Sequence, residues 1–158
     1  MAHSAGLAAQ GQESIKGSAV RSAIRGTLAD NPTLEALLPG GIYDDKREIS
    51  RAGTPAAFDD NSELMPCLLI KSAFDSADGP DDIGSLAYMD LYLYERDGYS
   101  TIDQVLGLAR QLLHRQKIGT DTDRIFEARW LNDVPGLEDG ALLSSLTVSR
   151  YQLARYIG

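Results

Sequence analysis

The segment from Leu86 to Tyr94 limits the fold of this chain more than any other part of the sequence. Its residues alternate with a period of two and are rich in aromatic rings, a pattern typical of a β-strand. One face of that strand is an ordinary core face made of Ala87, Met89, Leu91 and Leu93. The opposite face carries Leu86, Tyr88, Asp90, Tyr92 and Tyr94.

The three tyrosines of the second face form too much apolar surface to be left in water. We therefore expect a sheet that is covered on one face by its own helices and on the other by a neighbouring subunit. The alternative is that a helix of the same chain, with the N-terminal helix as the candidate, packs on the tyrosine face.

The last predicted strand, 141–157, adds further tyrosine and arginine residues. These residue types are enriched at the energetic centres of protein interfaces. The residues that we predict at a subunit or partner interface are Tyr88, Tyr92, Tyr94, Arg150, Tyr151 and Arg155.

The other predicted elements complete an α+β fold, a mostly antiparallel sheet with helices packed on one face. Residues 1–12 are expected to form a flexible arm, and 13–158 a single domain with a long loop at about 44–64 that could include a strand near 47–51. Helices are predicted at 13–29, 32–38 and 102–118, and strands at 42–43, 66–74, 86–94, 124–131 and 141–157. We expect Asn31 and either Ser100 or Thr101 as helix N-caps, Gly119 as a helix stop, a turn at 133–136 and a bulge near 149–150.

Composition excludes several functional classes. The 158 residues carry a net charge of -8, which argues against general binding to nucleic acid phosphates or to anionic membranes. An acidic surface also suits a protein that must not adhere to DNA. There is neither a signal-peptide run at the N-terminus nor a stretch of about 20 apolar residues, so we expect an intracellular origin and no membrane span.

Catalytic, cofactor-binding and metal-binding residues are not predicted. His3 lies in the arm, and His114 falls on the polar face of its helix, although distant residues could still complete a Ser-His-Asp triad. The single cysteine, Cys67, is expected to be a small buried hydrophobic residue. The acidic clusters at 59–63 and 75–82, including the pair Asp81 and Asp82, are better explained as solvated loops than as calcium or acid–base sites.

In element order, the chain resembles the tail-terminator or tail-completion proteins of tailed bacteriophages and related gene transfer agents. The segments that carry the resemblance are Thr33 to Leu38, Gly41 to Asp44, Asp90 to Tyr94, the helix Ile102 to Ile118, and the closing strands Phe126 to Leu131 and Leu142 to Tyr156. These segments cover most of the chain outside the arm and the long loop.

The resemblance implies a structural, non-enzymatic subunit of a ring, commonly a hexamer, at the head-proximal end of a virion tail. Such a ring, assembled in the host cytoplasm, ends polymerisation of the tail tube, contacts the tube and the neck proteins, and lets DNA pass through its lumen without specific binding. It further implies that the long loop reaches a neighbour or the lumen through Arg47, Arg51, Asp59, Asp60 and Glu63. The alternatives are another head–tail connector subunit, a host adaptor module, or a small ligand-binding or enzyme domain.

Overall fold

The computed structural model describes residues 17–75, 86–119 and 126–155. Within these ranges the helices are α2 (Gly17–Ala29), α3 (Pro32–Leu37) and α4 (Ser100–Leu113), with a short 3₁₀ helix η1 (Pro55–Ala57). The strands are β1 (Ile42–Tyr43), β2 (Cys67–Asp75), β3 (Leu86–Glu95), β4 (Gln116–Ile118), β5 (Phe126–Asp139) and β6 (Ser144–Arg155).

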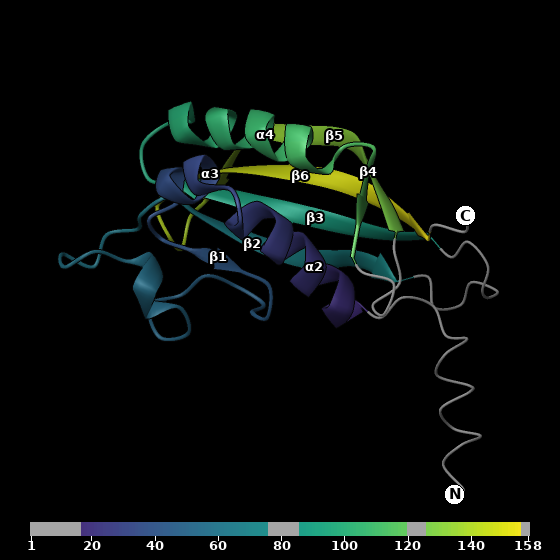
Figure 1. The fold of residues 1–158 in the computed structure, drawn as a ribbon. Helices are drawn as coiled ribbons and strands as arrows, with labels where there is room; N and C mark the ends of the chain where they lie inside the picture. The colour runs from purple at the N-terminus through teal and green to yellow at the C-terminus, as the bar shows by residue number, and fades with distance from the viewer. Residues whose placement is uncertain (1–16, 76–85, 120–125, 156–158) are drawn as a thin grey trace, which may run out of the picture.

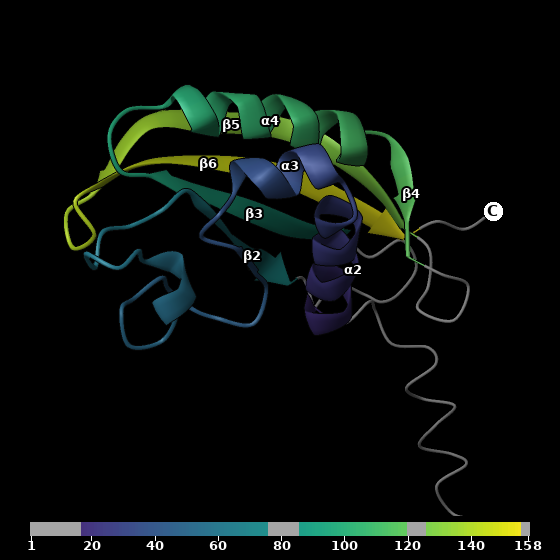
Figure 2. The same cartoon turned by 60° about the vertical axis from the view of Figure 1, so that its left-hand side comes forward.

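The strands form one sheet in the order β1-β2-β3-β6-β5-β4. β1 and β2 are parallel, and the other neighbours are antiparallel. All three helices lie on the same face of this sheet, in front of the strands in Figures 1 and 2. The predicted α+β fold with helices on one face is therefore confirmed.

The core between the helices and the sheet is built from the predicted face of β3. Met89, Leu91 and Leu93 are buried there against Val20 and Ile24 of α2 and against residues of α3 and α4. The N-terminal helix therefore packs opposite the tyrosines, and the alternative in which it covers the tyrosine face is wrong.

Two arginines of α2 fix the edge strand β1 in place. Arg21 donates to the carbonyl oxygen of Asp44 and to Oγ of Ser72, both at 2.8 Å, and Arg25 donates to the carbonyl oxygen of Ile42 at 3.0 Å. Carbonyl groups at a sheet edge lack strand partners, so these side chains satisfy acceptors that a second strand would otherwise bind.

The β5–β6 hairpin differs from the prediction. β6 pairs with β3 without interruption from Leu86↔Ala154 to Glu95↔Ser145, so the bulge predicted near 149–150 is absent from β6. The register shifts lie in β5 instead, between Trp130 and Asn132 and between Val134 and Leu137. The turn predicted at 133–136 is therefore wrong: these residues belong to β5 and contain its second register shift. The chain reverses direction at 140–143 instead.

The prediction of a bulge rests on the apolar residues of 141–157, which change from even to odd positions near 149–150. The structure shows why they do so. Thr147 and Ser149 are 0% and 1% exposed and face the helices, although they are polar. Ser149 Oγ donates to the Asp133 carboxylate at 2.6 Å, which offsets the cost of burying that hydroxyl. Polar residues in core positions therefore hid the regular alternation of this strand.

The helix ends were predicted in part. Asn31 caps α3, since its side chain accepts from the Leu34 amide at 2.9 Å. α4 has no cap from Ser100 or Thr101. The carboxylate of Glu95 accepts instead from the amides of Thr101 and Ile102, at 2.8 and 3.1 Å.

The other end of α4 and the long loop also correct the prediction. α4 stops at Leu113 rather than near 118, because Arg115 takes a φ of 61° and the chain continues as β4. The loop contains η1 and no strand at 47–51. The predicted arm lies outside the described residues, and no described helix is long and apolar enough to cross a bilayer.

Gly40 sets the spacing between the α3–β1 turn and β2, which gives a test of the fold. A Cβ at Gly40 would lie 2.8 Å from the carbonyl oxygens of both Met65 and Pro66. Gly40→Ala should therefore lower the free energy of unfolding by about 2 kcal/mol through overpacking. Gly26→Ala is the matched control, because that Cβ meets nothing within 4 Å in the middle of α2 and should raise stability by about 0.5–1 kcal/mol. Urea unfolding of both variants measures this, and equal effects would contradict the packing described for Gly40.

Candidate functional site

The face of the sheet opposite the helices, called the open face here, presents side chains in rows that cross β2, β3, β6 and β5. The strand registers place Cys67, Tyr94 and Leu146 in one row, and Leu69, Tyr92, Val148 and Val134 in the next. The third row contains Lys71, Asp90, Arg150 and Asn132. Tyr88 and Gln152 follow in the fourth.

The chain covers one end of the open face with its own 44–64 segment. Ile49, Ala57 and Leu64 of this segment are buried in a second apolar cluster with Cys67, Leu69 and Tyr94, beside Leu142. Figure 1 shows the segment at the end of the sheet where β2 begins. Tyr94 is only 5% exposed and is therefore a core residue of the subunit, which corrects its predicted place at an interface.

The remainder of the open face is half-buried in the isolated subunit. Tyr88, Tyr92 and Val148 are each partly exposed, and Val134 on β5 is 45% exposed. The described helices all lie on the other side of the sheet, so this part of the face stays accessible to a second molecule as far as the described residues extend.

An ion pair between Asp90 and Arg150 lies at the centre of the open face. Arg150 makes a two-pronged contact with Asp90, with Nε to Oδ1 at 2.8 Å and a terminal nitrogen to Oδ2 at 3.0 Å. The Asp90 side chain is 6% exposed, whereas that of Arg150 is 47% exposed. Lys71 lies 4.9 Å from the centre of the Tyr92 ring, and the Arg150 guanidinium lies 6.0 Å from that of Tyr88. The fixed pair and the cations above the rings restrain both tyrosines.

Tyr151 does not belong to the open face. It is 1% exposed and packs in the helix-side core, with Met89 and Trp130 as its neighbours on the adjacent strands. Burial raises the pKa of its hydroxyl, as it does for Tyr94. The predicted interface role of Tyr151 is therefore corrected, because its ring is enclosed by the subunit itself. Arg155 is the last residue of β6.

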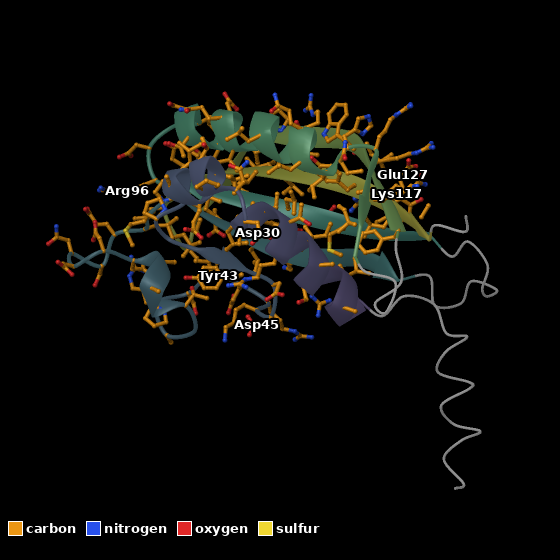
Figure 3. The ribbon with its side chains drawn as sticks, in the orientation of Figure 1. Asp30, Tyr43, Asp45, Arg96, Lys117 and Glu127 are labelled. Carbon is orange, nitrogen blue, oxygen red and sulfur yellow. The ribbon has the colours of Figure 1, made fainter. Side chains whose placement is uncertain are left out.

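The charged residues predicted to reach a neighbour through the long loop divide into two groups. Two of them bond within the loop, and a third ties the loop to the residue that follows β3. Arg51 donates twice to the Ser62 carbonyl oxygen, at 3.1 and 2.9 Å, and Asp59 accepts from two loop amides. Glu63 pairs at 2.7 Å with Arg96, which Figure 3 labels at this end of the molecule. Arg47 and Asp60 are exposed and stay candidates for an external contact.

A polar cluster joins α4 to β5 and β6, and the sequence did not reveal it. The Asp133 carboxylate accepts from Trp130 Nε1 at 2.8 Å, from Ser149 Oγ at 2.6 Å and from Arg110 at 3.0 Å. Arg110 also stacks on the Trp130 ring at 3.8 Å. Arg110 on the helix and Asp133 on the strand are 23 positions apart in the sequence. No local sequence pattern predicts such a contact, which forms only when the chain folds.

His114 has a structural partner. Its Nδ1 accepts from the Trp130 amide at 3.0 Å, so that nitrogen carries no proton, and the imidazole bonds to the outer edge of β5. Burial raises the pKa of the Cys67 thiol to about 12, so it is a buried, unreactive group. No group of three His, Cys, Asp or Glu side chains in the described ranges could hold a metal ion, and Asp81 and Asp82 lie outside those ranges.

Comparison with known proteins gives a fold likeness. No family model matches the chain, and no curated protein matches its sequence. A chain in the solved structure of the virion of a native gene transfer agent particle matches with a TM-score of 0.56 and 13% identity, over 85% of this chain and 92% of that one. A second solved structure matches with the same TM-score and identity over 92% and 99% of the two chains. At this identity the likeness shows a shared fold.

The contribution of the Asp90–Arg150 ion pair to stability can be tested by substitution. Arg150→Leu leaves the buried Asp90 carboxylate without its partner and should lower the free energy of unfolding by about 2 kcal/mol. Arg129→Leu is the control, since the pair of Arg129 with Glu127 is solvated, with side chains 54% and 32% exposed. Its loss should cost about 0.5 kcal/mol or less. Denaturant unfolding at low salt measures both values, and equal losses would show that Asp90 needs no partner.

Proposed function

We propose that this chain is a structural subunit of a tailed, phage-like particle, and that its open face contacts another subunit of the particle. The observation that carries the proposal is the accessible part of that face, where Tyr88 and Tyr92 flank the fixed Asp90–Arg150 pair. The fold shared with a chain of a gene transfer agent virion supports it.

The open face has the physical properties of a protein-binding surface. Tyrosine rings supply contact area with few rotatable bonds, and the two rings here are already restrained by neighbouring cations. A partner that binds them therefore spends little free energy on ordering side chains. The ion pair gives the same surface polar groups in fixed positions, which favours one orientation of the partner.

Within the particle we assign the chain the role of a tail terminator. A ring of such subunits, commonly six, would end the tail tube at its head-proximal end and join it to the neck. The net charge of -8 supports a place around a DNA passage, because an acidic lumen repels the duplex. Exposed Arg47 and Asp60 are the loop residues that we assign to contacts with a neighbour or with the lumen.

The residues with catalytic potential support this structural role. His114 Nδ1 is occupied by a backbone amide, and the Asp133 carboxylate is occupied by three donors that tie α4 to the sheet. Neither group faces a reactive partner among the described residues. The other function to be tested is that of a different head–tail connector subunit, which would share the particle but not the position at the end of the tube.

Particles purified from cells that carry the gene test the proposal directly. We expect the chain to copurify with tailed particles at a constant small number of copies, and labelling with a specific antibody should mark the junction of tail and head. Label on the head side of the neck would identify a different connector subunit. If the chain stays in the soluble fraction of cells that make particles, the proposal is wrong.

Substitutions on the open face test the surface itself. Tyr92→Asp and Val134→Asp should leave folded subunits that fail to join tails to heads, so that tails of irregular length accumulate in electron micrographs. Val134 is 45% exposed, so its variant folds even if Tyr92→Asp does not. Ser22→Asp on the exposed side of α2 adds the same charge and should leave assembly unchanged. Normal particles from Val134→Asp would exclude the open face as a contact.

A further inference from the structure

The outer edge of β2 is only partly paired. β1 pairs with Leu68 and Leu69, so residues 70–75 of β2 have no strand partner on this side in the part of the chain that the structure describes. The Leu68 amide donates to the Gly41 carbonyl oxygen, on the β1 side, at 3.0 Å. Because backbone amides alternate in direction along a strand, the Ser72 amide points to the same side, beyond the end of β1. Such an edge can pair with another extended segment.

A groove with a volume of about 350 Å³ lies against this unpaired edge. It is lined by residues 70–72 of β2, by residues 44–47, which follow β1, and by Arg21 of α2. Arg21 joins two sides of the groove, since it donates to the Asp44 carbonyl oxygen and to Ser72 Oγ, both at 2.8 Å. The shape of the groove is therefore fixed by bonds within the subunit.

Cations gather in this groove although the chain has a net charge of -8. No salt bridge joins these cations to a carboxylate in the described ranges, whereas four arginines elsewhere in the subunit have such a partner. The carboxylates of the groove are those of Asp44 and of Asp45, which Figure 3 labels. The subunit therefore leaves positive charge here that an acidic partner can neutralise. The lining cations are Arg21, Lys46, Arg47 and Lys71.

We propose that the β2 edge and this groove bind an extended, acidic segment of a partner protein, which adds to the sheet as a strand beside residues 70–75. Main-chain hydrogen bonds to the edge supply affinity in this mode of recognition, and the side chains of the segment supply specificity. Carboxylates of the segment would pair with Lys46, Arg47 and Lys71. Six residues of a strand span about 20 Å, so the occupant is a short linear segment.

The strand edge and the charge together select this occupant. A second copy paired through its own β2 edge would bring the same four cations together, and like charges oppose that contact. A nucleic acid would meet the cations, but it lacks the main-chain groups that complete a sheet edge, and the net charge of the chain opposes it. The inference goes beyond the proposed function, in which the open face contacts another subunit, and either contact can form without the other.

NMR titration of the full chain, labelled with ¹⁵N and kept in 0.1 M NaCl, tests the site. The probe is a capped six-residue peptide in which glutamate alternates with valine or threonine. We expect saturable shifts of the amide signals of Ile70, Lys71 and Ser72, and at least tenfold slower exchange of the Ser72 amide with solvent at saturation. Two control peptides should bind at least fivefold more weakly: one has glutamine for each glutamate, and one of equal charge has a central proline, which disrupts strand pairing.

Arg47→Glu should weaken binding of the acidic peptide at least fivefold, because it reverses an exposed cation of the groove. Arg115→Glu is the matched control: it makes the same change of charge at an exposed residue beside β4, at the opposite edge of the sheet, and should leave binding unchanged.

The inference would be overturned by shifts outside the β2 edge alone, by the absence of saturable binding, or by equal binding of either control peptide. Equal effects of the two variants, or tighter binding of single-stranded oligothymidylate than of the acidic peptide, would overturn it as well. Subunits that fail to bind the peptide and still enter particles would overturn this site and leave the proposed function standing.

Discussion

The pairing of β3 with β6 decides how the surfaces of this protein are used. Because side chains alternate along a strand, the register that sets Asp90 opposite Arg150 also sends Met89, Leu91 and Leu93 to the helices and Tyr88 and Tyr92 to the other face. A slip of one residue would exchange the two faces and expose the core. The ion pair across the two strands forms in the observed register and would be lost in a one-residue slip, which sends Asp90 and Arg150 to opposite faces. It therefore stabilises the arrangement on which both the helix-side core and the open face are built.

The two faces of the sheet serve different purposes. The helix side is covered by α2, α3 and α4. Arg21 and Arg25 bond to the β1 edge of the sheet, and the Asp133 cluster joins α4 to β5 and β6. The open face is closed at one end by the 44–64 segment and is accessible beyond it in the described part of the chain. Side chains that could have served chemistry, such as His114 and Cys67, are used to complete the fold. The accessible part of the open face is the surface on which the proposed role in assembly rests.

The sequence predicted what depends on local pattern. The alternation of apolar and polar residues in 86–94 predicts both faces of β3. The helical spacing of apolar residues elsewhere predicts the helices that cover one of those faces. It could not show that Tyr94 lies beneath the chain's own loop, because the 44–64 segment has no periodicity and meets the sheet through Ile49, Ala57 and Leu64. Tyr151 was assigned to the wrong side because the core positions before it are Thr147 and Ser149. These two polar residues are buried by neighbouring strands and by α4. A local sequence pattern contains no information about such distant contacts.

The claim at the centre of this account is that the accessible tyrosines of the open face become covered when the subunit joins its particle. Hydroxyl-radical footprinting of the isolated subunit and of the assembled form measures this for each ring separately. We expect oxidation of Tyr88 and Tyr92 to fall several-fold on assembly, while Tyr94 and Tyr151 stay protected in both states. Equal oxidation of Tyr88 and Tyr92 in the two states would contradict the account.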